Sequence, residues 1–371
     1  MRVPLLDLQA QYAGLEEELD AALKRVCRSG AFALGPEVEQ FERSWAAYCE
    51  AEHCSGVSSG TSALHLALLA VGVGPGDEVI TTPMSFFATV EVILYVGAHP
   101  VFADIDPQTG NIDVGRIEGL ITRRTRAILP VHLFGQPADM DPILELAGQN
   151  DLAVIEDACQ AHGALYKGRK VGALGDAGAF SYYPTKNLNA FGEAGAVVTN
   201  DPELDARVKM LRNHGQNARY RHAAVGYNYR MDGLQGAVLN VKLPHLDRWN
   251  ERRRQIARRY TEGLASVPVT PIAEAPHARA VWHVYAMRCE ERDGLQEYLS
   301  DAGIATGIHY PVPMSHQEAL RPYGVAAEPG ALPEAERLAR ETLSLPLYPE
   351  MTDEQVDYVI ERVRDFYSKA R

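Results

Sequence analysis

The chain lacks any apolar run long enough to cross a membrane, which takes about 20 consecutive apolar residues, although 46% of its 371 residues are hydrophobic. Its first residues, 1–9, also lack the apolar stretch and cleavage site of a signal peptide, so we expect a cytoplasmic protein. Basic residues are in deficit: 36 Lys and Arg stand against 49 Asp and Glu, a net charge of −13. This deficit argues against nucleic acid or an anionic membrane as a partner.

Cysteines and metal-binding patterns are sparse. The five cysteines are odd in number and scattered, at Cys27, Cys49, Cys54, Cys159 and Cys289. Cys49 and Cys54 lie close together, but no second pair accompanies them, and the twelve histidines include no His-Glu-x-x-His pattern. These features favour reduced thiols in a cytosolic protein over disulfides or a zinc site. We therefore predict no metal.

What the sequence does contain is an alternation of apolar runs with helix-like stretches over its first two-thirds. We predict strands over residues 54–58, 78–82, 100–104, 127–131, 152–156, 177–183 and 194–199. Helices are predicted between several of them, at 62–71, 87–95 and 140–150. Strands that alternate with helices predict an α/β fold with a mostly parallel sheet and helices on both of its faces.

The chain is too long for one core of ordinary size, so we expect two domains. Residues 1–240 would form the large domain, whose N-terminal segment could pack on the small one. Residues 241–371 would form a connecting helix and a smaller α+β domain. The connector, 234–264, is broken at Pro244 and carries a run of arginines, which we interpret as a solvated helix face.

Polar residues follow three of the predicted strands, and ligands of open α/β sheets bind outside the carboxyl ends of the strands. The first group is the strand-to-helix turn at Gly60, Thr61 and Ser62. Gly60 permits a tight turn, while two hydroxyls and the free N–H groups of a new helix suit a phosphate. On this segment alone, an ordinary Ser/Thr helix cap is the simpler explanation.

The second group ends the strand at 152–156 with Glu156 and Asp157. A carboxylate at that depth needs a partner, either a protonated heterocyclic nitrogen or an Arg or helix N–H. An Asp that faces a pyridinium keeps that nitrogen protonated, which pyridoxal phosphate requires in order to act as an electron sink. Gln160 and His162 on the next turn can reach ring substituents, although a lone histidine is more often structural.

The third group centres on Lys186, between two apolar strands. A buried lysine with a lowered pKa is a nucleophile suited to Schiff-base formation, whereas a surface lysine on a turn has no such role. Ser181 precedes it and can point at a phosphate. A phosphate turn, a strand-end Asp, a Ser and a buried Lys, in this order, predict pyridoxal 5′-phosphate. Phe86 also follows a strand end, and either stacks on the cofactor ring or belongs to the core.

These residues lie in recognisable motifs. They are Pro4-Leu-Leu-Asp-Leu8, Ser59-Gly-Thr-Ser-Ala-Leu64, Glu156-Asp-Ala-Cys-Gln-Ala-His-Gly163, Tyr183-Pro-Thr-Lys-Asn-Leu188, Gly192-Glu-Ala-Gly195, Arg212-Asn-His-Gly215, Gly226-Tyr-Asn-Tyr-Arg-Met231 and Gly307-Ile-His-Tyr-Pro-Val-Pro313. From end to end, the chain resembles the DegT/DnrJ/EryC1/StrS family of sugar aminotransferases. The resemblance implies the type I aminotransferase fold, dependence on pyridoxal phosphate, and pyridoxamine phosphate as an intermediate.

The resemblance also implies a role for each site residue. Lys186 would be the Schiff-base lysine and the proton shuttle. The cofactor contacts would be Asp157 to the pyridine nitrogen, Gln160 to the ring hydroxyl, Phe86 to the ring face, and Thr61, Ser62 and Ser181 to the phosphate. Some relatives with His in place of the lysine are dehydratases, so the presence of Lys186 favours transamination.

Two further expectations concern the partner and the substrate. Asn228 resembles an asparagine that reaches the phosphate from the other subunit, which implies a homodimer with a shared active site. Arg230, His309 and Tyr310 resemble contacts to the sugar nucleotide. Other nearby cations are Arg212, Arg219 and Arg221, for which a solvated surface is the simpler interpretation.

The implied reaction moves an amino group from an amino acid, L-glutamate by expectation, to a keto-sugar nucleotide. The motifs around Lys186 and His309 look more like members that aminate C-3 than those that aminate C-4. A dTDP-dideoxyhexose and a UDP-N-acetyl sugar both remain open as the substrate. The alternatives are a C-4 aminotransferase, a regulatory protein that keeps the fold without turnover, and another reaction on the same cofactor, such as sugar dehydration or inosose amination.

Overall fold

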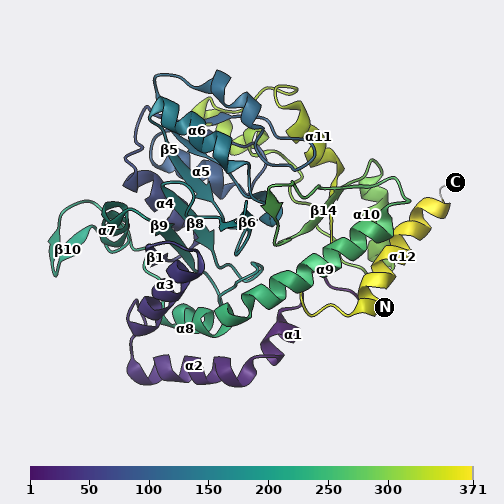
Figure 1. Ribbon diagram of the computed structural model, residues 1–371, viewed down its shortest axis with the longest axis horizontal. Coiled ribbons are helices and arrows are strands. Elements are labelled where there is room, and N and C mark those ends of the chain that lie inside the picture. The colour runs from purple at the N-terminus through teal and green to yellow at the C-terminus, as the bar shows by residue number, and fades with distance from the viewer. Residues whose placement is uncertain (370–371) are drawn as a thin grey trace.

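The computed structural model describes residues 1–369, in which a seven-stranded sheet has helices packed on both faces (Figure 1). The strand order is β1-β9-β8-β5-β4-β2-β3. These strands are β1 (His53–Val57), β2 (Glu78–Thr81), β3 (His99–Phe102), β4 (Thr125–Leu129), β5 (Ala153–Asp157), β8 (Ala177–Ser181) and β9 (Gly195–Thr199). β9 is antiparallel to both of its neighbours, and the other strands run in one direction. The predicted mostly parallel, mixed sheet is confirmed.

Helices surround this sheet and continue into the C-terminal third. They are α1 (Leu8–Ala13), α2 (Glu16–Ser29), α3 (Pro36–Tyr48), α4 (Gly60–Ala70), α5 (Ala88–Tyr95), α6 (Met140–Asn150), α7 (Pro202–Leu211), α8 (Gly233–Lys242), α9 (Leu246–Leu264), α10 (Arg292–Asp301), α11 (Pro333–Glu341) and α12 (Asp353–Lys369). None of the helices within residues 1–369 is long and apolar enough to span a membrane.

Alternate side chains of the strands enter two different cores, because successive residues of a strand point to opposite faces. Val154 and Phe180 belong to the core that also contains apolar residues of α3 and α6. Ile155 and Val197 belong to the core formed with α4 and α5. Both faces of the sheet are therefore covered, which explains why these strands are continuous apolar runs in the sequence.

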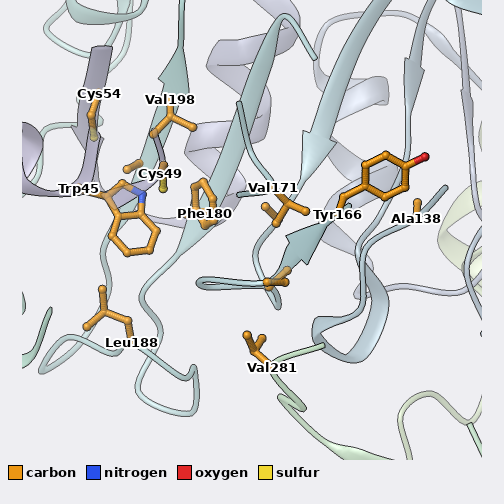
Figure 2. Close-up of a cluster of buried hydrophobic side chains, with 14 of the residues drawn as sticks. Trp45, Cys49, Cys54, Ala138, Tyr166, Val171, Phe180, Leu188, Val198 and Val281 are labelled. Atoms are coloured by element: carbon orange, nitrogen blue, oxygen red, sulfur yellow. The ribbon is translucent and has the colours of Figure 1, made fainter. Parts of the chain in front are cut away.

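Part of the first core is shown in Figure 2. Trp45 of α3 meets Phe180 of β8 edge to face, with ring centroids 5.0 Å apart. Cys49 and Cys54 lie in the same cluster, and all five cysteines are free thiols. Burial raises the pKa of Cys49 well above its ordinary value. A buried thiol of this kind packs as a small apolar side chain and is unreactive.

The sequence patterns did not predict α1 to α3, although signals for two of them are present. Leu19, Ala22 and Val26 recur at helical spacing along α2, and all three are buried. Pro36 stands in the first turn of α3, a position that suits proline. α2 and α3 pack against α8, so the N-terminal segment closes the sheet on the β1 side.

The connector between the two parts of the chain is α8 followed by α9. A 3-10 turn, Leu243–His245, separates the two helices at the break predicted from Pro244. Arg258 on α9 is exposed, as predicted, but Arg253 is only 3% exposed. Its guanidinium donates to the Leu347 carbonyl at 2.8 Å. The interpretation as a solvated face is therefore wrong for Arg253, which ties α9 to the C-terminal part through main-chain acceptors.

A separate hydrophobic core lies in the C-terminal third. It packs α9, α10 and α12 around a three-stranded sheet. The strands of this sheet are β12 (Thr270–Pro271), β14 (Tyr285–Arg288) and β15 (Thr342–Leu345). Val3 also enters this core, and its N–H donates to the Gly303 carbonyl at 2.9 Å. The division into domains at residue 240 stays a prediction.

Short strands make up the remaining β-structure. Three of them form a small sheet in the order β13-β6-β7, namely β6 (Leu165–Tyr166), β7 (Arg169–Lys170) and β13 (Ala278–Arg279). β10 (Gln216–Ala218) and β11 (Arg221–His222) form a hairpin that projects from the body of the protein beyond α7 (Figure 1). At its tip, Tyr220 is 79% exposed.

Candidate active site

The carboxyl edge of the large sheet brings the predicted strand-end residues together. Asp157 ends β5, Ser181 ends β8, and Gly60 begins α4 after β1. A Cβ on Gly60 would lie 2.6 Å from the Cβ of Ser181 and 2.9 Å from Sγ of Cys159. Because atoms cannot approach so closely without displacement, only glycine lets the start of α4 lie against the end of β8.

The start of α4 has the features of an anion site. Ser59 caps the helix: its Oγ accepts from the Ser62 N–H at 3.1 Å, and the Ser62 Oγ accepts from the Ser59 N–H at 2.9 Å. The Ser62 hydroxyl is therefore engaged in the cap. Among residues 1–369, nothing accepts from the N–H groups of Gly60 and Thr61 or bonds the Thr61 hydroxyl. Free donors at the positive end of a helix suit a phosphate.

The two carboxylates at the end of β5 have different surroundings. Glu156 is fully buried and accepts hydrogen bonds from His132 at 2.8 Å and from the Gly172 N–H at 2.7 Å. Burial raises the pKa of Glu156, but these hydrogen bonds lower it by more, so the pKa lies below its ordinary value. Asp157 accepts from the Thr89 hydroxyl at 2.8 Å and from the main-chain N–H of Cys159 at 3.2 Å. Glu156 is therefore structural, and Asp157 is the carboxylate beside the lysine.

Lys186 lies in a turn after β8, where its N–H donates to the Tyr183 carbonyl at 2.9 Å. The side chain is half-buried, and within residues 1–369 its amine has no hydrogen-bond acceptor. Burial lowers the pKa of Lys186, and the negative charge of Asp157 opposes this effect only in part. The alternative of an exposed turn lysine is therefore wrong: Lys186 is a poorly solvated amine in the field of Asp157.

Three histidines near Lys186 are held neutral. Burial, reinforced by the charge of Lys186, lowers the pKa of His162 to about 3 and that of His309 to about 4. The same causes lower the pKa of His283 well below its ordinary value. Nε2 of His162 lies 2.8 Å from the main-chain oxygen of Ser181. His162 therefore supports the end of β8, which is the structural alternative for this residue.

Gln160, Tyr310 and Phe86 form one side of the site. The Gln160 side-chain oxygen accepts from the Phe134 N–H at 2.8 Å, and its NH₂ group donates to the Tyr310 hydroxyl at 3.2 Å. Burial, with the charge of Asp157, raises the pKa of Tyr310, so its hydroxyl stays protonated. Phe86 is 59% exposed and its ring centroid lies 6.5 Å from that of Tyr310. The core alternative for Phe86 is therefore wrong.

Asn228 and Arg230 belong to a segment that runs beside the end of β1. The Ser58 N–H donates to the Tyr229 carbonyl at 2.9 Å, which places this segment next to the start of α4. Nη1 of Arg230 donates to Asn213 Oδ1 at 2.9 Å, and the side chain is half-buried. Asn228 is exposed; its main chain pairs with Asn213, but its side-chain amide has no hydrogen bond within the described chain.

The other predicted cations differ from one another. Arg212 is 7% exposed; it forms an ion pair with Glu42 and donates to the Gly56 carbonyl at 2.6 Å. The solvated-surface interpretation is therefore wrong for Arg212, which anchors β1. Arg219 and Arg221 are exposed on the β10–β11 hairpin, as that interpretation predicts.

Sequence reasoning missed two hydroxyls and a histidine at the site. Thr89 and Ser85 lie behind Asp157, and His283 lies near Lys186. Ser85 and Thr89 follow β2 with the spacing of one helical turn, which is the only signal in the sequence. Their relation to Asp157 depends on the parallel packing of β2, β4 and β5, which the local sequence does not reveal.

Comparison with known proteins gives one family for the whole chain. The DegT/DnrJ/EryC1/StrS aminotransferase family matches residues 14–364. A "Pleiotropic regulatory protein" from Geobacillus stearothermophilus is 48% identical over 99% of this chain and 99% of its own. A dTDP-3-amino-3,4,6-trideoxy-α-D-glucose transaminase from Streptomyces venezuelae is 48% identical over 98% of this chain and 96% of its own. A UDP-N-acetyl-3-dehydro-α-D-glucosamine 3-aminotransferase from Acidithiobacillus ferrooxidans is 41% identical over 98% of this chain and 97% of its own.

Solved structures agree with this result. The structure of DesV from S. venezuelae in complex with a ketimine intermediate matches with a TM-score of 0.96 and 48% identity, over 99% of this chain and 98% of DesV. NtdA from Bacillus subtilis with bound cofactor PMP matches with a TM-score of 0.92 and 33% identity, over 99% of this chain and 85% of NtdA. The lysine, the carboxylate and the anion site thus lie at one sheet edge of a fold that this protein shares with these solved structures. The chain belongs to the DegT/DnrJ/EryC1/StrS aminotransferase family.

Proposed function

We propose that the protein is a sugar-nucleotide aminotransferase that moves an amino group from L-glutamate to the C-3 keto group of a nucleoside-diphosphate sugar. The enzyme class follows from the family. The observation that carries the proposal is the poorly solvated amine of Lys186, which lies in the field of Asp157 and has no acceptor within residues 1–369. A lysine prepared in this way serves as a nucleophile and a base.

The enzyme depends on pyridoxal 5′-phosphate, and the described residues fit this group. The unpartnered N–H groups of Gly60 and Thr61 would hold the phosphate, together with the hydroxyls of Thr61 and Ser181. We propose a lesser role for Ser62, because its hydroxyl is engaged in the helix cap. When bound, the cofactor supplies an electron sink for the carbon whose proton is removed.

The ring of the cofactor would meet three other side chains. Asp157 would pair with the ring nitrogen, and the Gln160 amide would reach the ring hydroxyl from its fixed position between Phe134 and Tyr310. The exposed ring of Phe86 is available for stacking. These assignments extend the sequence prediction, and cofactor-binding measurements on single variants test them.

Lys186 performs the proton transfers. Its lowered pKa makes the neutral amine available, so that Nζ can take a proton from the α-carbon of the amino donor. In the second half of the reaction, the same amine would carry a proton from the cofactor carbon to the sugar carbon that receives the amino group. His162 and His309 stay neutral, so they do not add positive charge beside the lysine.

The names of relatives support C-3 as the position of amination. The transaminases from S. venezuelae and A. ferrooxidans carry position 3 in their names. Their nucleotides differ, dTDP in one and UDP in the other, and an assay with both nucleotides distinguishes them. For Arg230, His309 and Tyr310 we propose contacts with the sugar nucleotide. Arg230 lies on the segment beside the start of α4, Tyr310 accepts from Gln160, and His309 lies in the field of Lys186.

A half-reaction with L-glutamate tests the proposal. The enzyme loaded with cofactor should lose its visible absorbance on addition of L-glutamate, and 3-keto and 4-keto sugar nucleotides should then be compared by mass spectrometry. Lys186→Ala should lose covalent attachment of the cofactor. An enzyme that binds the cofactor but reacts with no amino donor would instead be a regulatory protein. Turnover of 4-keto sugars alone would overturn the C-3 assignment.

We also infer a homodimer with shared active sites, in the cytoplasm. The exposed amide of Asn228 has no partner within residues 1–369, although its segment lies next to the phosphate site. If it acts on the partner's site, mixed dimers of Lys186→Ala and Asn228→Ala subunits contain one intact site and recover activity. Confirmed subunit exchange without any recovery would show that Asn228 does not act across the interface.

A further inference from the structure

Two buried hydroxyls, those of Ser85 and Thr89, form a chain of hydrogen bonds that ends at Asp157. Oγ of Ser85 lies 2.8 Å from Oγ1 of Thr89, which in turn donates to Oδ2 of Asp157 at 2.8 Å. The three residues are 4%, 1% and 4% exposed, respectively. The chain of hydrogen bonds is therefore shielded from water over its whole length.

The direction of these bonds follows from the acceptor. An ionised carboxylate can only accept hydrogen bonds, so Thr89 must donate to Asp157. The one hydroxyl proton of Thr89 is then used, and Ser85 must donate to Thr89. A donor whose own oxygen accepts a hydrogen bond is polarised and binds its acceptor more strongly. Ser85 therefore strengthens the bond from Thr89 to Asp157.

A capping role does not account for this pair. α5 begins at Ala88, and Phe87 at its N-cap position makes no side-chain cap bond in the described chain. Thr89 lies inside the helix, where its main-chain N–H donates to the Phe86 carbonyl at 3.1 Å. Its hydroxyl donates to Asp157 and, within the described chain, accepts from no N–H group of the first turn.

The second oxygen of Asp157 is also held, since Oδ1 accepts from the Cys159 N–H at 3.2 Å. Donors at both oxygens fix the rotation of the carboxylate and stabilise its ionised form. We propose that Thr89, oriented by Ser85, is a positioning residue that keeps Asp157 an oriented anion and thereby keeps the ring nitrogen of bound pyridoxal phosphate protonated. This inference rests on the proposed cofactor site.

The consequence concerns one proton, which the ring nitrogen and Asp157 share. A carboxylate that loses a donor becomes a stronger base. Without the Thr89 hydroxyl, the shared proton shifts from the nitrogen toward Asp157. The cofactor then withdraws electrons less strongly, so the half-reaction slows while the binding of the amino donor is unaffected.

The test uses cofactor labelled with ¹⁵N in the ring, bound to the full-length protein. In the wild type and in Thr89→Ser, the ¹⁵N resonance should lie at the position of a protonated pyridine. In Thr89→Val, which keeps the shape but lacks the donor, it should move toward the neutral position. Ser85→Ala should move it the same way by a smaller amount. The kcat of the glutamate half-reaction should fall about tenfold in Thr89→Val, the effect of one hydrogen bond to a charged group, with KM unchanged.

Thr81→Val is the matched control. Thr81 is also a buried threonine whose hydroxyl donates, here to the Leu129 carbonyl at 2.7 Å. This variant should leave the ¹⁵N resonance in place. If Thr89→Val does not fold, Ser85→Ala and Thr89→Ser still decide the question. An unshifted resonance in Thr89→Val or Ser85→Ala, with cofactor bound, would overturn this inference but leave the proposed function intact. Failure of the wild type to bind the cofactor would overturn the proposed function with it.

Discussion

Gly60 and Ser181 lie in direct contact across the carboxyl edge of the sheet, with 2.6 Å between the Ser181 Cβ and the place of a Cβ at position 60. This contact joins the start of α4 to the end of β8. The proposed phosphate donors at the start of α4 and on Ser181 therefore depend on the absence of a side chain at position 60.

Gly60→Ala should weaken cofactor binding and destabilise the protein, because overpacking a tight contact typically costs about 1–3 kcal/mol. The measurements are the dissociation constant of pyridoxal phosphate and the midpoint of thermal unfolding. Gly148→Ala is the control, since a Cβ there meets nothing within 4 Å and the residue lies in α6. That variant should be neutral or slightly stabilised. Equal cofactor affinity in both variants would contradict the proposed phosphate site.

The reactivity of Lys186 should depend on pH in a way that free lysine does not. Burial lowers its pKa, so the neutral amine should appear at lower pH than the ordinary lysine value of about 10.4. The rate of reaction of Lys186 with an amine reagent, followed by mass spectrometry in the cofactor-free protein, gives its titration. The charge of Asp157 raises the pKa of Lys186, so Asp157→Asn should move this titration to still lower pH. A Lys186 midpoint at or above the ordinary lysine value would contradict this account.

Lys242 should make stability depend on pH above neutrality. It is 2% exposed, its ammonium donates to the side-chain oxygens of Gln11 and Asn189, and burial lowers its pKa to about 8. Below pH 8 both folded and unfolded chains hold the proton. Between about pH 8 and 10.5 only the unfolded chain holds it, so wild-type stability should rise with pH relative to Lys242→Met, by up to about 3 kcal/mol.

Denaturant unfolding at pH 7, 8, 9 and 10 measures this difference, and the other titrating groups cancel between the two proteins. The prediction concerns only how the difference in unfolding free energy changes with pH. Its absolute value also contains another effect, because Lys242→Met leaves the oxygens of Gln11 and Asn189 without a donor. A difference that is constant across this range would mean that Lys242 keeps its proton in the folded state.

Arg230→Ala should weaken binding of the sugar nucleotide without affecting the amino donor. Arg230 is half-buried, and one of its nitrogens is already bound to Asn213. Loss of a charge-assisted contact with a substrate should raise the KM for the sugar nucleotide about tenfold or more. Steady-state kinetics with both substrates gives the two KM values. Arg258→Ala, which removes an exposed cation on α9, is the control for net charge and should change neither.

The sequence predicted the large sheet well for a physical reason. β5, β8, β9 and the C-terminal parts of β2 and β4 are buried on both faces, so each gives an apolar run that ends where the chain reaches the sheet edge. The polar residues at those ends, such as Asp157 and Ser181, were therefore visible as candidates. The helices α2 and α3 were not predicted, although their apolar residues recur at helical spacing among charged ones.

Other residues could not be assigned from local sequence, since their neighbours are far away in the chain. Arg212 and Arg253 have the polar sequence surroundings of surface residues, but other segments cover them and supply carbonyl or carboxylate acceptors. Thr89 is 68 residues from Asp157 in sequence, and only the pairing of parallel strands brings them together.

The sequence by itself determined the identity of the chemistry: a lysine after a buried strand, an aspartate at the end of another, and a glycine at a helix start, in an order that indicates one cofactor. The tertiary structure decided what state these groups are in. Burial lowers the pKa of Lys186, and Thr89 and the Cys159 N–H hold Asp157 from two sides. The reason is that desolvation and hydrogen bonding depend on which distant segments cover a group, and only the tertiary packing of strands, helices and loops sets that.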